Sequence, residues 1–304
     1  MSFSYNTKTE LCKLPQDNKC CAVAECYGML LYCNTFSARE IRIITGNHQL
    51  GSRMSQQFSL AFAISFDIMP KMGKEGKQAY IIRDSEKLNR VFETYGFSSD
   101  SLLAHHVNLG VLEEECCRRS FIRGAFLTGG AITDPAKSYH LELVTDHYNV
   151  SREMYSLMLE MDFYPKEMMR GGNYVTYFKQ SSAIEDFLTM IGAPIHAMEL
   201  MSAKIEKDMR NSVNRKVNCD TANVTKTVDA SAAQIEAIRK IEIAGAFENL
   251  PDKLRQTALL RLQNPELSIK ELAEMSIPPV SKSCLNHRLR KLTELSQIAP
   301  NPRL

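Results

Sequence analysis

KCCAVAECYGMLLYCN, residues 19–34, has a copy further along the chain. Shifting the sequence by 96 residues places it on ECCRRSFIRGAFLTGG, residues 115–130, with both adjacent cysteine pairs aligned and Gly28 on Gly124. Two matched cysteine pairs are hard to obtain by chance. An internal repeat therefore decides the fold, because each copy is expected to be one structural unit.

The likeness extends well past these two stretches. Alternating, β-rich residues predict strands, and apolar residues at helical spacing predict helices. Each half-repeat, about residues 19–97 and 115–193, is expected to run helix, strand, helix, strand, helix, with Ser52 and Ser151 capping the middle helices. The aligned segments after the glycine helices are 41–45 with 141–145, 52–66 with 151–164, 78–84 with 173–180, and 85–97 with 181–193.

The two aligned glycines suggest how the halves meet. Gly28 and Gly124 have no side chain, so two helices that carry them can cross with their backbones in close contact. We therefore expect a pseudo-twofold domain in which the repeated helices pack against each other.

The composition is that of a globular protein. The chain has 304 residues, 44% of them hydrophobic, enough for one large or two medium domains. No window approaches the roughly 20 apolar residues that a membrane helix needs. The N-terminus, MSFSYNTKTELCKLPQDNKCC, is polar where a secretion signal is apolar. We expect a cytoplasmic protein with no membrane role.

The nine cysteines include two adjacent pairs, 20–21 and 116–117, but no CxxC spacing. This pattern favours neither a disulfide framework nor a zinc site. We expect reduced, mostly buried thiols and neither a metal nor another cofactor.

The formal net charge of +2 is unevenly distributed. Residues 1–199 hold 20 Lys and Arg against 23 Asp and Glu, a net of −3, whereas residues 200–304 hold 17 against 12, a net of +5. The basic excess favours an anionic partner for the last third. Part of it lies in the helical run 198–218, which either faces solvent or contacts phosphates as an arm. The candidate contact residues of this run are Arg210, Arg215 and Lys216.

After a predicted linker at residues 217–230, which is rich in Thr, Asn and Asp, the sequence is helical in pattern. Ser268 and Glu271 form a capping box at the start of a short helix, and a short turn follows it. A short capped helix, a turn and a longer helix with a leucine stripe form the helix-turn-helix pattern. The predicted helices are 231–250, 251–265, 268–276 and 281–295, and the stripe is Leu285, Leu289 and Leu292.

The exposed face of the last helix has the character of a DNA-reading surface. Between Lys282 and Lys291 there are four Lys or Arg residues and no acid. Arg and Asn make bidentate contacts to bases, and Lys and Ser hold phosphates. The alternatives are a helical hairpin with a solvated basic face and a helix-turn-helix used for protein contacts. The candidate DNA-binding residues are Ser281, Lys282, Ser283, Asn286, His287, Arg288, Arg290 and Lys291.

The tandem glycine helices resemble those of the LAGLIDADG homing endonucleases. The name LAGLIDADG is the family's nine-residue motif. Two segments of this chain align with it: CYGMLLYCN, residues 26–34, and IRGAFLTGG, residues 122–130. The resemblance places Cys33 and Gly129 where the family has metal-binding carboxylates. A thiol and a glycine cannot supply the hard oxygen ligands that magnesium needs, so we expect no enzyme activity.

Two further expectations concern this domain. An active nuclease remains the less favoured alternative, with Asp134, Glu142 and Asp146 as substitute acids. The resemblance also implies a saddle of strands that could lie over DNA, although ordinary solvent-facing charges are an equal alternative for its basic residues. The strand positions that would reach phosphates are Arg42, Arg83 and Lys179.

Three motifs in this order, RGAFLTGGAITDP, NSVNRKVNCDTANVTKTV and SKSCLNHRLRKL, closely resemble the WhiA family of bacterial sporulation and cell-division regulators. The resemblance implies an α+β protein with a degenerate, pseudo-twofold LAGLIDADG-like N-terminal domain and an all-α helix-turn-helix domain. The one departure noted is Cys284, where the family is expected to have glycine. The expected division is 1–216, linker 217–230, helix-turn-helix domain 231–296 and tail 297–304.

The function implied by this resemblance is transcriptional regulation linked to sporulation, cell division or chromosome segregation. The expected partner is double-stranded DNA, with another transcription regulator or RNA polymerase as an optional protein partner. The expected location is the cytoplasm, in association with the nucleoid, and the expected state is a monomer or weak oligomer. The main alternative is a DNA-associated interaction protein that binds a division or regulatory partner.

Overall fold

The computed structural model describes residues 2–15, 18–70, 76–97 and 105–298. The chain forms two compact units, Met1–Asp208 and Met209–Leu304, which are described separately. The first combines helices and strands, and the second is helical, as the sequence predicts for an α+β protein. Among the described residues, no helix has the length and apolar character that crossing a membrane requires.

The N-terminal unit contains the same order of elements twice. Its first half consists of α1 (Phe3–Cys12), α2 (Lys19–Leu31), β1 (Thr35–Ser37), β2 (Glu40–Thr45), α3 (His48–Phe62), β3 (Gln78–Ile82) and α4 (Ser85–Thr94). Its second half consists of the 3-10 turn η1 (Leu109–Val111), α5 (Glu115–Gly129), β4 (Gly130–Ile132), β5 (Leu141–Thr145), α6 (Tyr148–Glu160), β6 (Lys166–Arg170), β7 (Asn173–Phe178) and α7 (Ser181–Ile191).

The structure adds elements that the sequence pattern did not indicate. β1 and β4 have three residues each, too few for an alternating pattern to be recognised. β6 is exposed along its whole length, and it pairs with β7 through a tight turn at Gly171 and Gly172, both with positive φ. Among the described residues of the first half, the corresponding place shows an isolated bridge between Ile68 and Ile81.

The predicted caps of the middle helices are wrong. α3 begins at His48 and is capped by Asn47, whose side chain accepts hydrogen bonds from the backbone N–H groups of Gln49 and Leu50. α6 begins at Tyr148, so Ser151 lies in its first turn and is buried. Ser52 lies inside α3, and Asn47 supplies the side-chain acceptor at the start of the helix.

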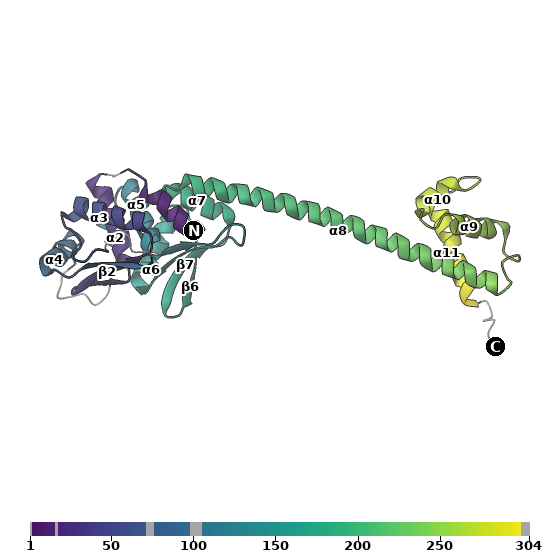
Figure 1. Ribbon diagram of the computed structural model, residues 1–304, viewed down its shortest axis with the longest axis horizontal. Coiled ribbons are helices and arrows are strands. Elements are labelled where there is room, and N and C mark those ends of the chain that lie inside the picture. The colour runs from purple at the N-terminus through teal and green to yellow at the C-terminus, as the bar shows by residue number, and fades with distance from the viewer. Residues whose placement is uncertain (1, 16–17, 71–75, 98–104, 299–304) are drawn as a thin grey trace. The chain divides into compact units, whose positions relative to one another are not determined.

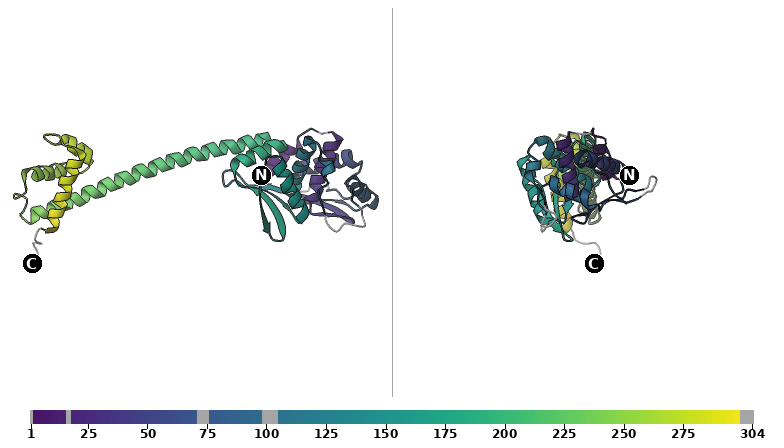
Figure 2. Two further views of the ribbon diagram at one scale, coloured as in Figure 1. Left: turned by 180° about the vertical axis from the view of Figure 1, so that it is seen from behind. Right: turned by 90° about the vertical axis from the view of Figure 1, so that its left-hand side faces the viewer.

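Each half places an antiparallel sheet against the helices. The strand order is β1-β2-β3 in one sheet and β4-β5-β7-β6 in the other. Ile41 and Ile43, like Leu141 and Leu143, point into the core. The alternate residues of the same strands therefore form an outer face that the helices do not cover. Figure 1 and Figure 2 show α2, α3 and α5 on one side of the strands.

The centre of this unit is the crossing of α2 and α5. A Cβ atom added to Gly28 would lie 2.0 Å from the backbone oxygen of Phe121, and one added to Gly124 would lie 2.0 Å from that of Glu25. The two backbones are therefore in direct contact, as the aligned glycines predict. Beside the crossing, the fully buried Glu25 carboxylate accepts hydrogen bonds from Arg53 at 2.5 and 2.7 Å and from Arg123 at 3.3 Å.

The helix α8 (Pro194–Ile243) follows the second half-repeat. The Glu10 carboxylate in α1 accepts hydrogen bonds from the backbone N–H groups of Ile195 and His196 at 2.8 and 3.1 Å, which satisfies the start of α8. The linker predicted at 217–230 is not irregular, since it continues this helix. The segment has no Gly or Pro, and its Thr, Asn and Asp residues each disfavour a helix only weakly.

The C-terminal unit packs three helices on the end of α8. They are α9 (Asp252–Gln263), α10 (Ile269–Met275) and α11 (Lys282–Ile298). Its separate core joins Ile238 and Ile241 of α8 to Leu254, Leu272 and the leucines of α11. The predicted tail is partly helical, because Gln297 and Ile298 belong to α11, and residues 299–304 lie outside the described residues.

Candidate nucleic-acid interface

The helix-turn-helix is built by local hydrogen bonds and a leucine stripe. In the capping box of α10, the Ser268 backbone N–H donates to the Glu271 carboxylate at 2.8 Å, and the Glu271 N–H donates to the Ser268 hydroxyl at 3.4 Å. The Ser281 hydroxyl accepts from the Cys284 N–H at 3.2 Å and so caps α11. The predicted stripe is confirmed, since Leu285, Leu289 and Leu292 are each 1% exposed.

This packing leaves the opposite side of α11 free. Because helical residues three and four apart share a face, Ser283, His287 and Arg290 lie together on the exposed side. Arg288 differs from the other candidates, because it is half-buried and lines a hollow between α9 and the end of α10. Arg290 pairs with Glu294 one turn later, at 3.2 Å. The exposed candidates are Ser281, Lys282, Ser283, Asn286, His287, Arg290 and Lys291.

The structure adds basic residues that sequence reasoning missed. Lys226, Lys270 and Lys282 come from α8, α10 and α11 and line one hollow of the C-terminal unit. Buried Arg261 borders the same hollow and donates to the Leu267 carbonyl at 2.7 Å, which braces the loop before α10. Lys226 was overlooked because its segment was interpreted as a linker, and Lys270 because it lies inside the capping box.

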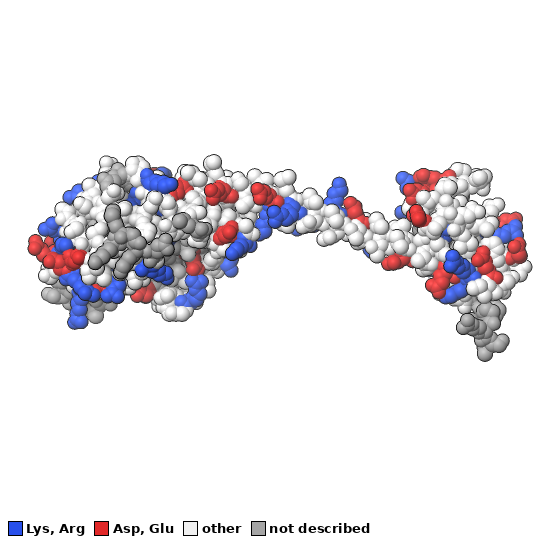
Figure 3. Space-filling model, viewed as in Figure 1, with Lys and Arg blue, Asp and Glu red and all other residues white. Residues whose placement is uncertain are grey.

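The predicted saddle residues are mostly engaged with neighbours. Arg42 and Arg83 both pair with Glu40 at 2.6 Å, and these hydrogen bonds lower the pKa of the Glu40 carboxyl. The ammonium of Lys179 lies 5.4 Å from the centre of the Tyr177 ring. On the face seen in Figure 3, positive and negative side chains alternate over this unit. Arg42 and Arg83 therefore share one carboxylate, which partly neutralises their charge.

The remaining candidate contact residues lie in α8. Arg210, Arg215 and Lys216 are exposed, in a helical stretch whose side chains face solvent from Arg210 to Ala230. Their exposure is compatible with both interpretations, a solvated helix and an arm that contacts phosphates.

Cys33 and Gly129, at the positions where LAGLIDADG nucleases have metal-binding carboxylates, are called the nuclease-like positions. They cannot hold a carboxylate pair as they stand. The half-buried Cys33 donates from its thiol to the Thr35 carbonyl at 3.1 Å, and loss of solvent around the thiol raises its pKa to about 12. A Cβ atom at Gly129 would lie 2.6 Å from the Val144 carbonyl oxygen and 2.8 Å from the Tyr32 ring. A side chain at 129 would therefore require movement of both the β5 backbone at Val144 and Tyr32.

The three substitute acids are each engaged elsewhere. Asp134 accepts from the Ala136 N–H at 2.9 Å, and Asp146 pairs with its neighbour His147 at 3.2 Å. Glu142 accepts two hydrogen bonds from Arg170, at 2.8 and 3.0 Å. In the part of the chain that the structure describes, they do not form a group with the spacing of metal ligands.

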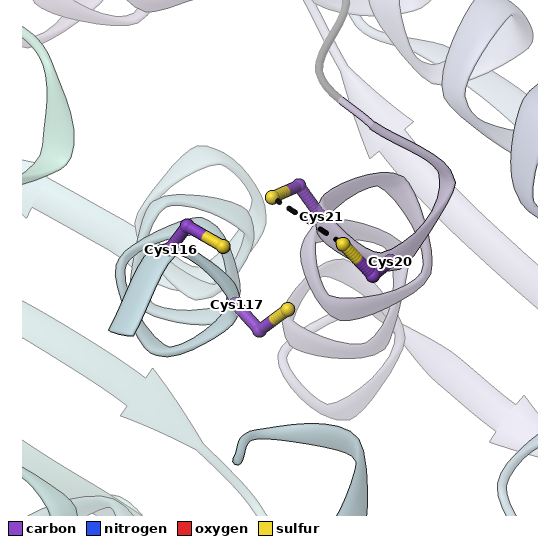
Figure 4. A group of neighbouring side chains, drawn as sticks. All are labelled: Cys20, Cys21, Cys116 and Cys117. Atoms are coloured by element: carbon purple, nitrogen blue, oxygen red, sulfur yellow. Dashed lines mark hydrogen bonds between the residues drawn. The ribbon is translucent and has the colours of Figure 1, made fainter. Parts of the chain in front are cut away.

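A group with that spacing is formed instead by the two cysteine pairs. Cys20, Cys21, Cys116 and Cys117 come together at the starts of α2 and α5, with all four sulfur atoms within 4.8 Å of one another (Figure 4). The absence of CxxC spacing, on which the expectation of no metal site is based, does not show this meeting, because it joins residues from two helices. The prediction of mostly buried thiols is also wrong, since four of the nine cysteines are exposed and three are buried.

A helix-turn-helix unit joined to a pseudo-twofold, LAGLIDADG-like unit defines a distinct class of protein. The family model of the WhiA C-terminal HTH domain matches residues 213–296, and that of the WhiA LAGLIDADG-like domain matches residues 118–210. Two similar chains are named probable cell division protein WhiA. The one from Ruminiclostridium cellulolyticum is 38% identical over 98% of this chain and 97% of its own, and the one from Alkaliphilus metalliredigens is 36% identical over 97% and 98%.

The chain therefore belongs to the WhiA family. The crystal structure of full-length WhiA from Thermotoga maritima covers 99% of this chain and 100% of that one, with a TM-score of 0.58 and 23% identity. This likeness shows that both chains share one fold.

Proposed function

We propose that this protein is a sequence-specific DNA-binding regulator in which α11 enters the major groove. The observation that carries the proposal is the two-sided character of α11. One side is buried through its leucines, and the other presents Asn286, His287 and Arg290 to solvent. Arg and Asn side chains are suited to bidentate contacts with guanine and adenine, which supports base reading by this face.

The hollow lined by Lys226, Lys270 and Lys282 supports a second part of the proposal. Three ammonium groups from three helices attract phosphates without reading sequence. We assign to this hollow the contacts that set the register of the protein on the DNA backbone.

The N-terminal unit is proposed to act without hydrolysing DNA. The crowding at Gly129 and the thiol at Cys33 support this, since neither side chain offers an oxygen ligand. We assign the unit to added affinity or to a protein surface for another transcription regulator or RNA polymerase. The relatives named as probable cell division proteins support a role in division or sporulation.

The cellular setting follows from the same proposal. A DNA-binding regulator acts in the cytoplasm at the nucleoid. The pseudo-twofold within one chain supplies both halves of the N-terminal unit, which supports a monomer or weak oligomer. Light scattering of the purified chain over a range of concentrations tests the oligomeric state.

The test is a gel shift on short genomic fragments in magnesium buffer at two salt concentrations, with recovered DNA checked for breaks. Arg290→Ala and Asn286→Ala are each expected to weaken specific binding by about 1–3 kcal/mol. Arg239→Ala removes an exposed charge from α8 in the same unit and serves as the control. Wild-type specific affinity in both α11 variants would refute the assignment of the reading helix.

A second candidate is an interaction protein for which DNA binding is incidental. The pairing of Arg42 and Arg83 with Glu40 favours it, because ion-paired arginines are less available to phosphates. If this candidate is correct, the gel shift should show DNA binding that does not depend on sequence and that disappears at the higher salt concentration. Broken DNA in the same assay would instead favour an active nuclease.

A further inference from the structure

Four thiols meet where the two repeated helices begin. Cys20 and Cys21 occupy the first turn of α2, and Cys116 and Cys117 occupy the equivalent positions of α5. Figure 4 shows the four sulfur atoms facing a common space between the two helices. The internal repeat thus supplies two thiols from each half to one place on the pseudo-twofold.

We propose that these four cysteines bind one zinc ion, at a site separate from the DNA-binding face. In a tetrahedral zinc site with Zn–S bonds of about 2.3 Å, the sulfur atoms lie about 3.8 Å apart. The sulfur atoms here are all within 4.8 Å of one another, so small side-chain rotations complete the tetrahedron. An iron–sulfur cluster would hold the same thiolates further apart, because iron and sulfide atoms lie between them.

The surroundings suit thiolate ligands. Cys20 and Cys116 are exposed and provide a route of entry, whereas Cys21 and Cys117 are buried and keep water away from the inner side. A bound cation and the N-terminal ends of two helices stabilise the thiolate forms of these cysteines, and the protons displaced by the cation are released to solvent.

The role assigned to the ion is structural. Zinc would join the first turns of α2 and α5 and close a loop of nearly the whole first half-repeat, which restricts the unfolded chain. Gly28 and Gly124 hold the same helices together further along. The nuclease-like positions Cys33 and Gly129 lie at the opposite ends of these helices, so the zinc takes no part in chemistry there.

The experiment is metal analysis of the untagged full-length chain, purified with reductant under anaerobic conditions. We expect about one zinc per chain. The double variant Cys20→Ser with Cys116→Ser removes two exposed ligands and is expected to lose at least about nine-tenths of the metal. The matched control is Cys219→Ser with Cys284→Ser, which removes two exposed thiols elsewhere and is expected to keep the zinc.

A second measurement does not depend on the variants folding. Cobalt added to the metal-free wild-type chain is expected to give the strong visible bands and thiolate charge-transfer bands of a four-sulfur tetrahedral site. Removal of zinc by a chelator is expected to lower the Tm of the N-terminal unit by several degrees. The proposal is overturned if the reduced wild-type chain binds neither metal at these thiols, if mass analysis of the native chain finds disulfides joining them, or if the Cys20/Cys116 variant retains stoichiometric zinc.

Discussion

Replacement of Gly124 by alanine is a direct test of the helix crossing on which the N-terminal unit depends. The new Cβ atom would lie 2.0 Å from the backbone oxygen of Glu25 and 3.0 Å from the backbone nitrogen of Met29. An ordinary contact between carbon and oxygen is above about 3 Å, so α2 and α5 must separate by about 1 Å. Backbone atoms cannot rotate away as a flexible side chain can.

Two opposing contributions determine the size of the effect. Alanine favours a helix over glycine by about 1 kcal/mol, which stabilises the variant. Overpacking costs typically about 1–3 kcal/mol, and the upper end applies where backbone meets backbone. Separation of the helices by about 1 Å also forfeits a quarter to a half of the dispersion energy of each contact along the crossing. We expect a net destabilisation of at least about 2 kcal/mol.

Calorimetry of the full chain measures the result through the unfolding transition of the N-terminal unit. For a unit of this size, the expected loss corresponds to a fall in Tm of about 4–8 °C. Gly46→Ala is the matched control, because its Cβ atom would lie 3.7 Å or more from its neighbours and its backbone φ is not positive. An unchanged or higher Tm for Gly124→Ala would refute the inference of direct backbone contact.

Three further predictions concern the same unit. Glu25→Ala removes the carboxylate that faces two buried guanidinium groups and is expected to cost about 3–5 kcal/mol in urea unfolding; a loss below about 1 kcal/mol would contradict this. Gly129→Asp is expected to lower Tm without creating magnesium-dependent nicking of plasmid, and nicking by this variant would show that one acid restores the nuclease. Burial lowers the pKa of His105 from 6.5 to about 4, so between these values the unfolded chain binds a proton that the folded chain does not. Stability is therefore expected to fall from pH 7 to pH 4, by about 1 kcal/mol for this half-exposed group, and His105→Gln should flatten the profile of urea midpoints.

Much of this architecture could be predicted because its signals are local or repeated. The offset of 96 residues aligned α2 with α5, and the expected strands and helices of each half are present. The capping box at Ser268 and the leucine stripe of α11 depend only on neighbours within one or two turns. The strands β1 and β4 escaped prediction because three residues carry too little periodicity to separate a strand from a loop, and β6 because its five residues are all exposed and do not alternate between apolar and polar.

The candidate site also contains residues that the sequence predicts and residues that only the structure reveals. The identity of the exposed residues of α11 follows from helical spacing once Leu285 and Leu289 are placed inside. The position of Lys226 in a basic hollow could not be predicted from helical spacing. It requires α8 to continue through a segment of linker-like composition and to meet α10. The engagement of Arg42 and Arg83 by Glu40 requires the pairing of β2 with β3.

The sequence by itself determined the repeat, the glycine crossing and the helix-turn-helix. The repeat and its glycines are found by comparing the sequence with itself, and the helix-turn-helix by periodicity and capping between residues close in the chain. Only the tertiary structure decided that Gly129 is too crowded for a side chain, and that Cys20 and Cys21 meet Cys116 and Cys117. These facts depend on distances between atoms on different elements. Spacing along the chain does not contain such distances, because they are set when α2 and α5 pack together and bring residues from the two halves into one place.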